Sequence, residues 1–235
     1  MRINKYLASC GIASRRKCED FILKGAVKVN GEVIKDLSFT VDEDRDYVMI
    51  FDKIITLNNI KKKYYMLNKP CGVISAASSD HGDITVVDLI KDSSVRLYPV
   101  GRLDKDTEGL ILLTNDGDFA YHLTHPKFEK RKVYEALVEG ILSDYNILQL
   151  IKGVFVDNDL LSAKDVKIIK KTGNQTLIQI IITEGKNRQI RKMLASINHK
   201  VIKLTRVEEA GLKLGDLKPG EYRELSESEV MCCLK

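Results

Sequence analysis

Three acidic side chains lie close together near the middle of the chain, at Asp104, Asp106 and Glu108 within YPVGRLDKDTEGLILLTNDG (98–117). A wholly apolar run, 110–113, follows them directly, and TNDG then supplies turn residues. A short apolar run bounded by turn residues is typical of a buried strand. We therefore expect a polar, acidic loop fixed beside a rigid strand, which is how reactive groups are usually held.

Metal binding is one chemistry that these acids could support. Their spacing superficially resembles a calcium loop, but such a loop needs a chelating acid at its twelfth position, which is Asn115 here. The four histidines and five cysteines show no spacing typical of metal ligands. We expect no metal, and metal-dependent RNA hydrolysis is kept as an alternative.

Cofactor chemistry has no sequence signature in this chain. Neither of the glycine-rich phosphate loops, GxxxxGK[ST] and GxGxxG, is present, and the nucleophile elbow GxSxG is missing as well. We therefore expect any reaction to depend on a carboxylate and to need no cofactor.

The composition indicates a cytosolic globular protein. Of 235 residues, 30% are charged and 44% apolar, and the net charge of +5 is by itself weak evidence for a nucleic-acid partner. No apolar run approaches the roughly 18 residues that span a bilayer, and the charged N-terminus is unlike a secretory signal. Five cysteines, an odd number, favour reduced thiols. We expect a cytoplasmic location and no membrane partner.

The first 60 residues have the pattern of a small basic module. Apolar spacing predicts a helix over 3–9 and a second helix that Ser14 caps, and Asn30-Gly31 predicts a hairpin turn between strands 26–29 and 32–34. Arg15, Arg16 and Lys17 would lie at the start of the second helix, where exposed backbone N–H groups also favour phosphates. The segment RINKYLASCGIASRRKCEDFILKGAVKVNGEVI resembles the S-four RNA-binding domain.

The remainder of the chain predicts a larger second domain. We place the boundary in the connection 51–63, which gives domains 1–60 and 61–235. Strands are expected over 64–68, 73–75, 110–113, 134–139, 165–170, 176–182 and 201–207, and helices over 86–90, 119–123, 144–152 and 186–195. Strand runs with separated helices favour an α+β fold, with a small α/β module followed by a catalytic domain whose mixed, mostly antiparallel sheet is flanked by helices and loops.

Four motifs of this second domain resemble those of RNA pseudouridine synthases of the RsuA/RluB type, which carry an N-terminal S-four domain. They are NKPCGVISA (68–76), RLYPVGRLDKDTEGLILLTNDG (96–117), HPKFEKRKVYEALVEG (125–140) and TEGKNRQIRKML (183–194). The resemblance covers essentially the whole chain with the motifs in order. It implies the pseudouridine synthase fold and an isomerase that converts the nitrogen–carbon glycosidic bond of a uridine into a carbon–carbon bond.

The resemblance also assigns roles to three residues. Asp104 matches the essential aspartate, which would act on the sugar or on the uracil. Tyr134 matches the tyrosine that stacks on the base, with its hydroxyl near the carbon 5 proton that must leave. Arg191 matches the basic residue that pairs with the aspartate and keeps it ionised, with Arg188 and Lys192 as close rivals. We expect Asp106 and Glu108 to be structural, with Asp106 paired to a lysine.

The target base must leave the RNA stack to reach such a site, and this requires a basic rim around the pocket. Lys130 and Arg131 could add to that rim. The residues that we expect to contact RNA are Arg15, Arg16, Lys17, Arg102, Lys132, Lys186, Arg188 and Lys192.

The sequence thus predicts an enzyme that isomerises a specific uridine in ribosomal RNA, with 23S RNA of the large subunit favoured. The alternatives are a synthase acting on 16S RNA and a non-catalytic RNA-binding factor of ribosome assembly. We expect the partner to be ribosomal RNA or a ribosomal assembly intermediate, and the protein to be a monomer.

Overall fold

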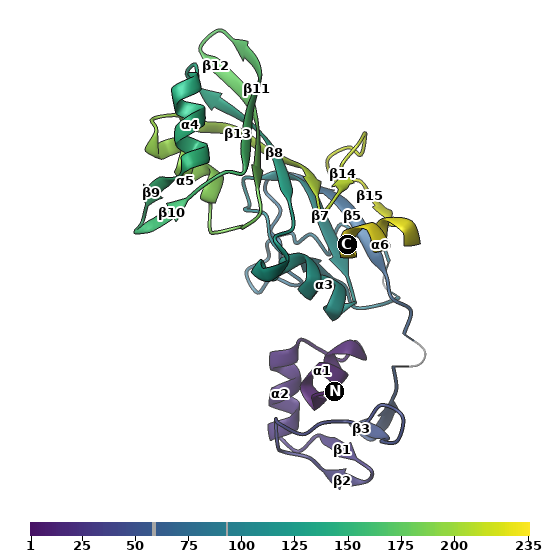
Figure 1. Cartoon of the computed structure of the whole chain (residues 1–235). Helices are drawn as coiled ribbons and strands as arrows, with labels where there is room; N and C mark the ends of the chain where they lie inside the picture. The colour runs from purple at the N-terminus through teal and green to yellow at the C-terminus, as the bar shows by residue number, and fades with distance from the viewer. Residues whose placement is uncertain (58–59, 93) are drawn as a thin grey trace. The chain divides into compact units, whose positions relative to one another are not determined.

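The computed structural model describes residues 1–57, 60–92 and 94–235, and these form two compact units (Figure 1). The first comprises the described parts of Met1–Lys63 and Asp92–Arg96, together with Asn115–Gly117, and the second contains the rest. Residues 58–59, inside the connection predicted over 51–63, lie outside the described residues.

The first unit contains the two predicted helices and a four-stranded sheet. Its helices are α1 (Ile3–Ser9) and α2 (Arg15–Leu23), and the Ser14 hydroxyl accepts a hydrogen bond from the backbone nitrogen of Lys17 at 3.3 Å, as expected of the cap. The sheet has the order β2-β1-β3-β4. Its strands are β1 (Val27–Val29), β2 (Glu32–Val33), β3 (Val48–Ile50) and β4 (Lys53–Ile55).

The beginning of the connection predicted over 51–63 is part of this sheet. Phe51 and Asp52 form a tight turn with positive φ angles of 49° and 58°, and β4 then pairs with β3. The sequence of this hairpin gives no Gly or Pro signal, so the turn and its second strand were missed.

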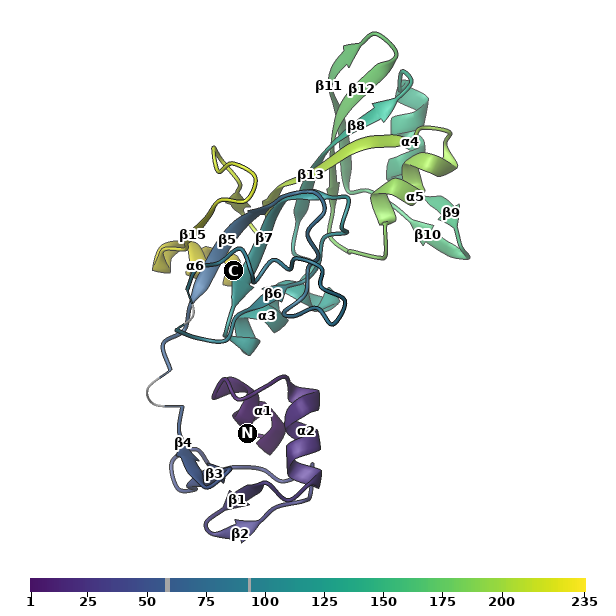
Figure 2. The same cartoon turned by 180° about the vertical axis from the view of Figure 1, so that it is seen from behind.

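The second unit is built on a nine-stranded sheet, in which β11, β12, β8, β13, β7, β5 and β15 follow one another, and β14 and β6 pair with β13 and β7 (Figures 1 and 2). β13 and β7 are parallel, whereas the other pairs are antiparallel, so the predicted mixed, mostly antiparallel sheet is confirmed. The strands are β5 (Tyr64–Lys69), β6 (Tyr98–Val100), β7 (Glu108–Thr114), β8 (Lys132–Glu139), β11 (Asp165–Thr172), β12 (Gln175–Ile182), β13 (Val201–Glu209), β14 (Leu212–Lys213) and β15 (Tyr222–Glu224).

Helices cover parts of this sheet. Phe119 and Leu123 of α3 and Cys233 of α6 pack with Leu110 and Leu112 of β7 in one apolar cluster. A two-stranded hairpin lies beside α5 (Figure 1). These elements are α3 (Gly117–Thr124), the 3-10 helix η1 (Pro126–Phe128), α4 (Asp144–Lys152), the hairpin strands β9 (Val154–Val156) and β10 (Asp159–Leu161), α5 (Gln189–Ser196) and α6 (Glu227–Leu234).

Two predicted elements of the second unit are wrong, and a third begins later than predicted. The strand expected over 73–75 is a single bridge between Ile74 and Thr85, and the helix expected over 86–90 is a turn in which the Asp88 carboxylate accepts a hydrogen bond from the backbone nitrogen of Thr85. The basic helix begins at Gln189 instead of Lys186, because Arg188 has a left-handed φ of 52°. Polar side-chain hydrogen bonds therefore replace regular structure in the two short segments.

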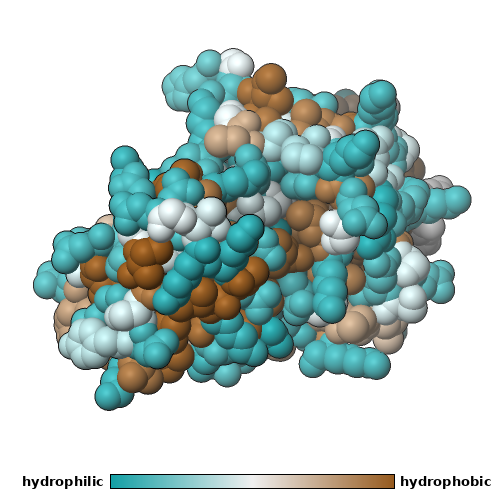
Figure 3. All heavy atoms as spheres, turned by 90° about the horizontal axis from the view of Figure 1, so that it is seen from above, coloured by the Kyte–Doolittle hydropathy of each residue, from teal (hydrophilic) through white to brown (hydrophobic). Residues whose placement is uncertain are grey.

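Exposed apolar side chains gather on α4 and on the β9–β10 hairpin. Tyr145, Leu148, Phe155 and Leu160 are each more than half exposed. Figure 3 shows apolar groups interrupting the charged surface of the protein. In the part of the chain that the structure describes, no helix has the length and apolar character needed to cross a membrane.

Candidate active site

The acidic loop between β6 and β7 is held by the segment that follows β5. Ser75 contacts Leu103 twice, since its hydroxyl accepts from the Leu103 nitrogen at 3.0 Å and donates to the Leu103 carbonyl at 2.8 Å. The backbone nitrogen of Gly72 donates to the Lys105 carbonyl at 2.8 Å. These contacts lie on both sides of Asp104, so the backbone that carries its carboxylate is fixed.

A buried lysine lies beneath the same loop. Lys69, the last residue of β5, is 0% exposed, and its ammonium donates to the carbonyls of Pro70 at 3.0 Å and Lys105 at 3.5 Å. Burial lowers the pKa of Lys69, and the nearby carboxylates, including those of Asp106 and Glu108, oppose this shift. Sequence reasoning missed the burial of Lys69, because the strand expected over 64–68 ends before it.

Two arginines from the start of α5 reach the acidic loop, and both bind Asp106. Arg188 donates from both terminal nitrogens to the Asp106 carboxylate, each at 3.0 Å. Arg191 donates to the Asp106 backbone carbonyl at 2.8 Å and lies 3.4 Å from its carboxylate. The hydrogen bonds from Arg188 lower the pKa of Asp106. The lysine partner expected for Asp106 is therefore wrong, and the expected pair of Asp104 with Arg191 is replaced.

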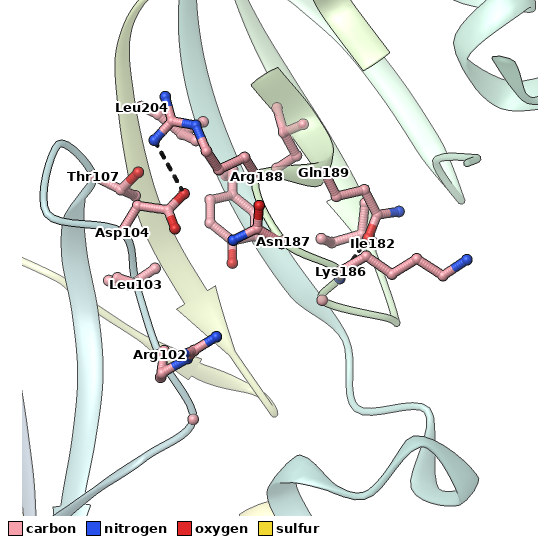
Figure 4. Close-up of a pocket in the computed structure, with 14 residues that line it drawn as sticks. Arg102, Leu103, Asp104, Thr107, Ile182, Lys186, Asn187, Arg188, Gln189 and Leu204 are labelled. Carbon is pink, nitrogen blue, oxygen red and sulfur yellow. Dashed lines mark hydrogen bonds and ion pairs between the residues drawn. The ribbon is translucent and has the colours of Figure 1, made fainter. Parts of the chain in front are cut away.

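Asp104 has its ion pair with Arg188 instead. The two side chains are 3.9 Å apart, and Figure 4 shows the Asp104 carboxylate turned toward the guanidinium. This separation is longer than a hydrogen bond, so Arg188 supplies positive charge without engaging the carboxylate oxygens closely. Arg188 was expected as an RNA contact and as a rival to Arg191 for the aspartate.

Asp104 and Tyr134 line one cavity of about 260 Å³. Thr107 contributes from the acidic loop, and the segment 185–190 forms the opposite wall. Tyr134, on β8, is only 7% exposed. Arg191 is not among the lining residues, so its contacts place it behind the loop and not at the cavity. The predicted aspartate and tyrosine are thus brought together, while the predicted arginine supports them from outside.

A second cavity of about 400 Å³ shares Arg102, Tyr134 and Lys186 with the first. Lys130 and Lys132 also line it. The Lys132 ammonium donates to the carbonyls of Lys130 at 3.1 Å and Thr183 at 3.5 Å, and burial lowers its pKa. Five Lys or Arg side chains line this cavity against two carboxylates, those of Glu184 and Glu209, so its lining is mainly positive.

The side of Tyr134 toward β13 holds a buried ion pair that sequence reasoning missed. Arg206 and Glu209 are each 2% exposed, and their charged groups are 3.1 Å apart. The Arg206 guanidinium also donates to the Leu110 carbonyl at 2.6 Å and to the Tyr134 hydroxyl at 3.5 Å. Four of the seven residues in KLTRVEE (203–209) are charged, so this segment carries no signal that two of them are buried.

The remaining predicted RNA contacts differ in their surroundings. Lys186 lines both cavities and lies 3.1 Å from Asp159, whereas Lys192 pairs with Asp157 at 2.9 Å and lines neither. In the first unit, Arg15 and Arg16 are exposed in the first turn of α2, and Lys17 lies 4.0 Å from Asp20. Among the described residues there is no group of three or more His, Cys, Asp or Glu side chains that could hold a metal ion.

Comparisons with known proteins identify the family of the chain. A family model described as RNA pseudouridylate synthase matches residues 63–196. The chain belongs to this family. A model of the S4 domain matches residues 1–46, so the predicted RNA-binding module is confirmed and RNA is the partner.

Relatives of this synthase family match along the whole chain. The ribosomal large subunit pseudouridine synthase B of Bacillus subtilis is 42% identical over 236 residues, which cover 97% of this chain and 93% of the relative. An uncharacterized RNA pseudouridine synthase of Aquifex aeolicus is 40% identical over 231 residues, covering 98% and 92%. A crystal structure of a pseudouridylate synthase has a TM-score of 0.70 and 28% identity, with 99% of both chains covered. The fold and the enzyme class predicted from the motifs are confirmed.

Proposed function

We propose that this synthase converts a specific uridine of 23S ribosomal RNA into pseudouridine, as a monomer acting on ribosomal RNA or on an assembly intermediate. The observation that carries the proposal is the cavity in which the Asp104 carboxylate and the Tyr134 ring meet beside the Arg188 guanidinium. The large-subunit assignment is supported by the B. subtilis relative, whose name specifies that subunit.

The reaction can be balanced with groups of this kind. The bond from the sugar to nitrogen 1 of uracil breaks, the detached base turns, and a bond from the sugar to carbon 5 forms. The proton of carbon 5 leaves and nitrogen 1 gains one, so no atom is added or removed overall. Asp104 supports the bond cleavage as a carboxylate acting on the sugar or the uracil, and Arg188 places a positive charge 3.9 Å from it.

Tyr134 and the second cavity have separate tasks in this proposal. The Tyr134 ring stacks on the extruded uracil, and its hydroxyl lies toward the carbon 5 proton. The phosphates on either side of the extruded nucleotide then bind at the second cavity, where Lys130 and Lys132 offer positive charge. Arg102, which lines both cavities, contacts the RNA where the base leaves the stack.

Tritium release from RNA labelled at carbon 5 of uridine tests this function. We expect release from 23S RNA, little from 16S RNA, no effect of a chelator, and a loss of more than about 100-fold in Asp104→Asn. Asp165→Asn is the matched control, since Asp165 also pairs with a basic side chain at 3.4 Å but lies on β11.

The other outcomes have defined meanings. Release from 16S RNA alone would make the subunit assignment wrong. RNA binding without release by the wild type would instead favour the non-catalytic assembly factor. Full activity of Asp104→Asn would remove the carboxylate from the mechanism, and inhibition by a chelator would favour metal-dependent chemistry.

A further inference from the structure

The Arg206 guanidinium and the Glu209 carboxylate are buried beside Tyr134, and both residues line the second cavity with it. Arg206 of β13 contacts β7 through the Leu110 carbonyl at 2.6 Å and contacts β8 through the Tyr134 hydroxyl at 3.5 Å. Its carbon Cζ also lies 6.0 Å from the centre of the Tyr134 ring. Taking two charges out of water is costly, and the attraction between them often only offsets this cost. A gain in stability is therefore not enough to explain why the pair is buried beside Tyr134.

The chemistry of the contact fixes the direction of the hydroxyl. A guanidinium only donates hydrogen bonds, so the Tyr134 oxygen must accept the one from Arg206. The phenolic proton therefore points away from Arg206. Because Tyr134 lines both cavities, this leaves the proton available to a bound base.

The charges around Tyr134 come from three elements. Arg206 and Glu209 face it from β13, Asp104 faces it from the loop before β7, and Lys132 lies near the pair on β8 itself. Burial raises the pKa of Tyr134, Arg206 opposes this, and Glu209 reinforces it. Burial also disfavours the charge of Arg206, but Glu209 and Tyr134 raise its pKa, so the guanidinium stays charged.

We propose that Arg206 and Glu209 are positioning residues that act through Tyr134: Arg206 sets the direction of the phenolic proton, and Glu209 offsets the guanidinium charge that lies beside the phenol. The proposal rests on the proposed catalytic role of Tyr134. It extends that role, because the tyrosine then needs a second pair of charges to hold its hydroxyl in the orientation that a bound base requires.

The decisive variant is Glu209→Gln, which keeps the shape of the side chain and removes its charge. Phenolate formation is followed by near-ultraviolet absorbance, and each protein is compared with its Tyr134→Phe counterpart, so that the difference reports Tyr134 alone. We expect this titration to move to lower pH by about one unit or more in Glu209→Gln, because the guanidinium charge is no longer offset. The pH profile of kcat for tritium release should move in the same direction.

A matched control distinguishes the proposed effect of Glu209 on Tyr134 from a general loss of stability. Thr176→Val removes another buried polar group of the sheet, since Thr176 is 0% exposed and its hydroxyl donates to the Gly140 carbonyl at 2.8 Å. We expect Thr176→Val to lower stability and to leave the Tyr134 titration in place. Arg206→Gln should move the titration to higher pH, and Arg206→Lys should restore part of the shift if both variants fold.

The inference is overturned if the Tyr134 titration in Glu209→Gln is unchanged or moves to higher pH. It is also overturned if Glu209→Gln changes kcat by the same factor in the wild-type and Tyr134→Phe backgrounds. The Tyr134 titration needs no RNA substrate. If the wild type releases no tritium, the proposed function is wrong, but the titration still decides the role of the ion pair.

Discussion

Asp104 and Asp106 are two residues apart, and the structure gives them different partners. Asp106 accepts both strong hydrogen bonds of Arg188 and is also contacted by Arg191. Asp104 is left with the longer separation of 3.9 Å. A carboxylate whose lone pairs are all engaged is a poor nucleophile or base, so this division leaves the Asp104 oxygens available to the substrate.

The two arginines should respond differently to substitution. Arg188→Gln removes a side chain that is 43% exposed, so we expect the free energy of unfolding to change by at most about 1 kcal/mol and kcat to fall about 10- to 100-fold. Arg191→Gln removes a side chain that is 13% exposed and leaves the Asp106 and Val201 carbonyls without the hydrogen bonds that it donates. We expect this variant to lose about 1–3 kcal/mol in the free energy of unfolding and to have a lower kcat. Tritium-release kinetics and denaturant unfolding measure the two effects.

Lys167→Gln is the control for these variants, because Lys167 forms an ion pair with Asp165 on β11, away from the acidic loop. Its kcat should match the wild type. If Arg191→Gln lowered kcat without any loss of stability, Arg191 would act at the substrate and not on the loop.

For single residues, the sequence predicted which residues form the site better than it predicted which side chains they contact. Motif order was enough to single out Asp104 and Tyr134, which line one cavity. The partner of Asp104 was missed because Arg188 and Arg191 are three positions apart, and two arginines with that spacing reach the same face. Which one meets which acid depends on the left-handed conformation of Arg188, for which NRQIR gives no signal.

Among the elements, β13 determines how closely β7, which follows the acidic loop, and β8, which carries Tyr134, approach each other. It lies between β7 and β8, and Arg206 is opposite Gly109 in the parallel pairing with β7. A Cβ at Gly109 would collide with the backbone oxygen of Arg206 and lie 2.6 Å from its nitrogen. Gly109 also has a φ of 108°, which side chains rarely adopt.

Gly109→Ala should therefore be severely destabilising. We expect a loss of about 3 kcal/mol or more in the free energy of unfolding, since the backbone atoms of β13 cannot move aside without breaking the sheet. Gly173→Ala is the control, because Gly173 has a φ of 56° in open space at the β11–β12 turn and should cost about 1 kcal/mol. Equal losses in the two variants would contradict the close approach; denaturant unfolding gives both values.

Long, strongly patterned elements were predictable and short ones were not. The helix over 144–152 is as expected, and the hairpin around Gly173-Asn174 is present as β11 and β12. The segments 73–75 and 86–90 differ because Ser75 and Asp88 hydrogen-bond to the backbone and hold irregular loops. β14 has only two residues and β15 three, which is too little sequence for a period to appear.

For the whole molecule, the N-terminal unit should add affinity without altering the chemical step. Its exposed bases can bind RNA phosphates, and the chain tethers this second contact to the catalytic unit. We expect the combined change Arg15→Gln and Arg16→Gln to raise KM and leave kcat at saturating RNA unchanged. The slope of the logarithm of the RNA binding constant against the logarithm of the salt concentration should become shallower by about 1 per lost phosphate contact.

Arg45→Gln is the matched control in the same unit, since its side chain is 86% exposed and lies 3.8 Å from the Asp42 carboxylate. It removes a positive charge elsewhere and should leave affinity and salt dependence nearly unchanged. If Arg45→Gln had the same effect per charge, the contribution of Arg15 and Arg16 would be a general electrostatic one and not a specific contact.

The central position of β13 also bears on when this enzyme can first work. Thr205 pairs with Glu108 across a large part of the chain, and synthesis reaches 201–209 only after the strands on both sides, β7 and β8, have been made. Until then a nascent polypeptide holds two unpaired strand edges and an unassembled catalytic centre. Activity during translation is thus impossible before the ribosome has passed this point, and the waiting edges are where a chaperone would be most useful.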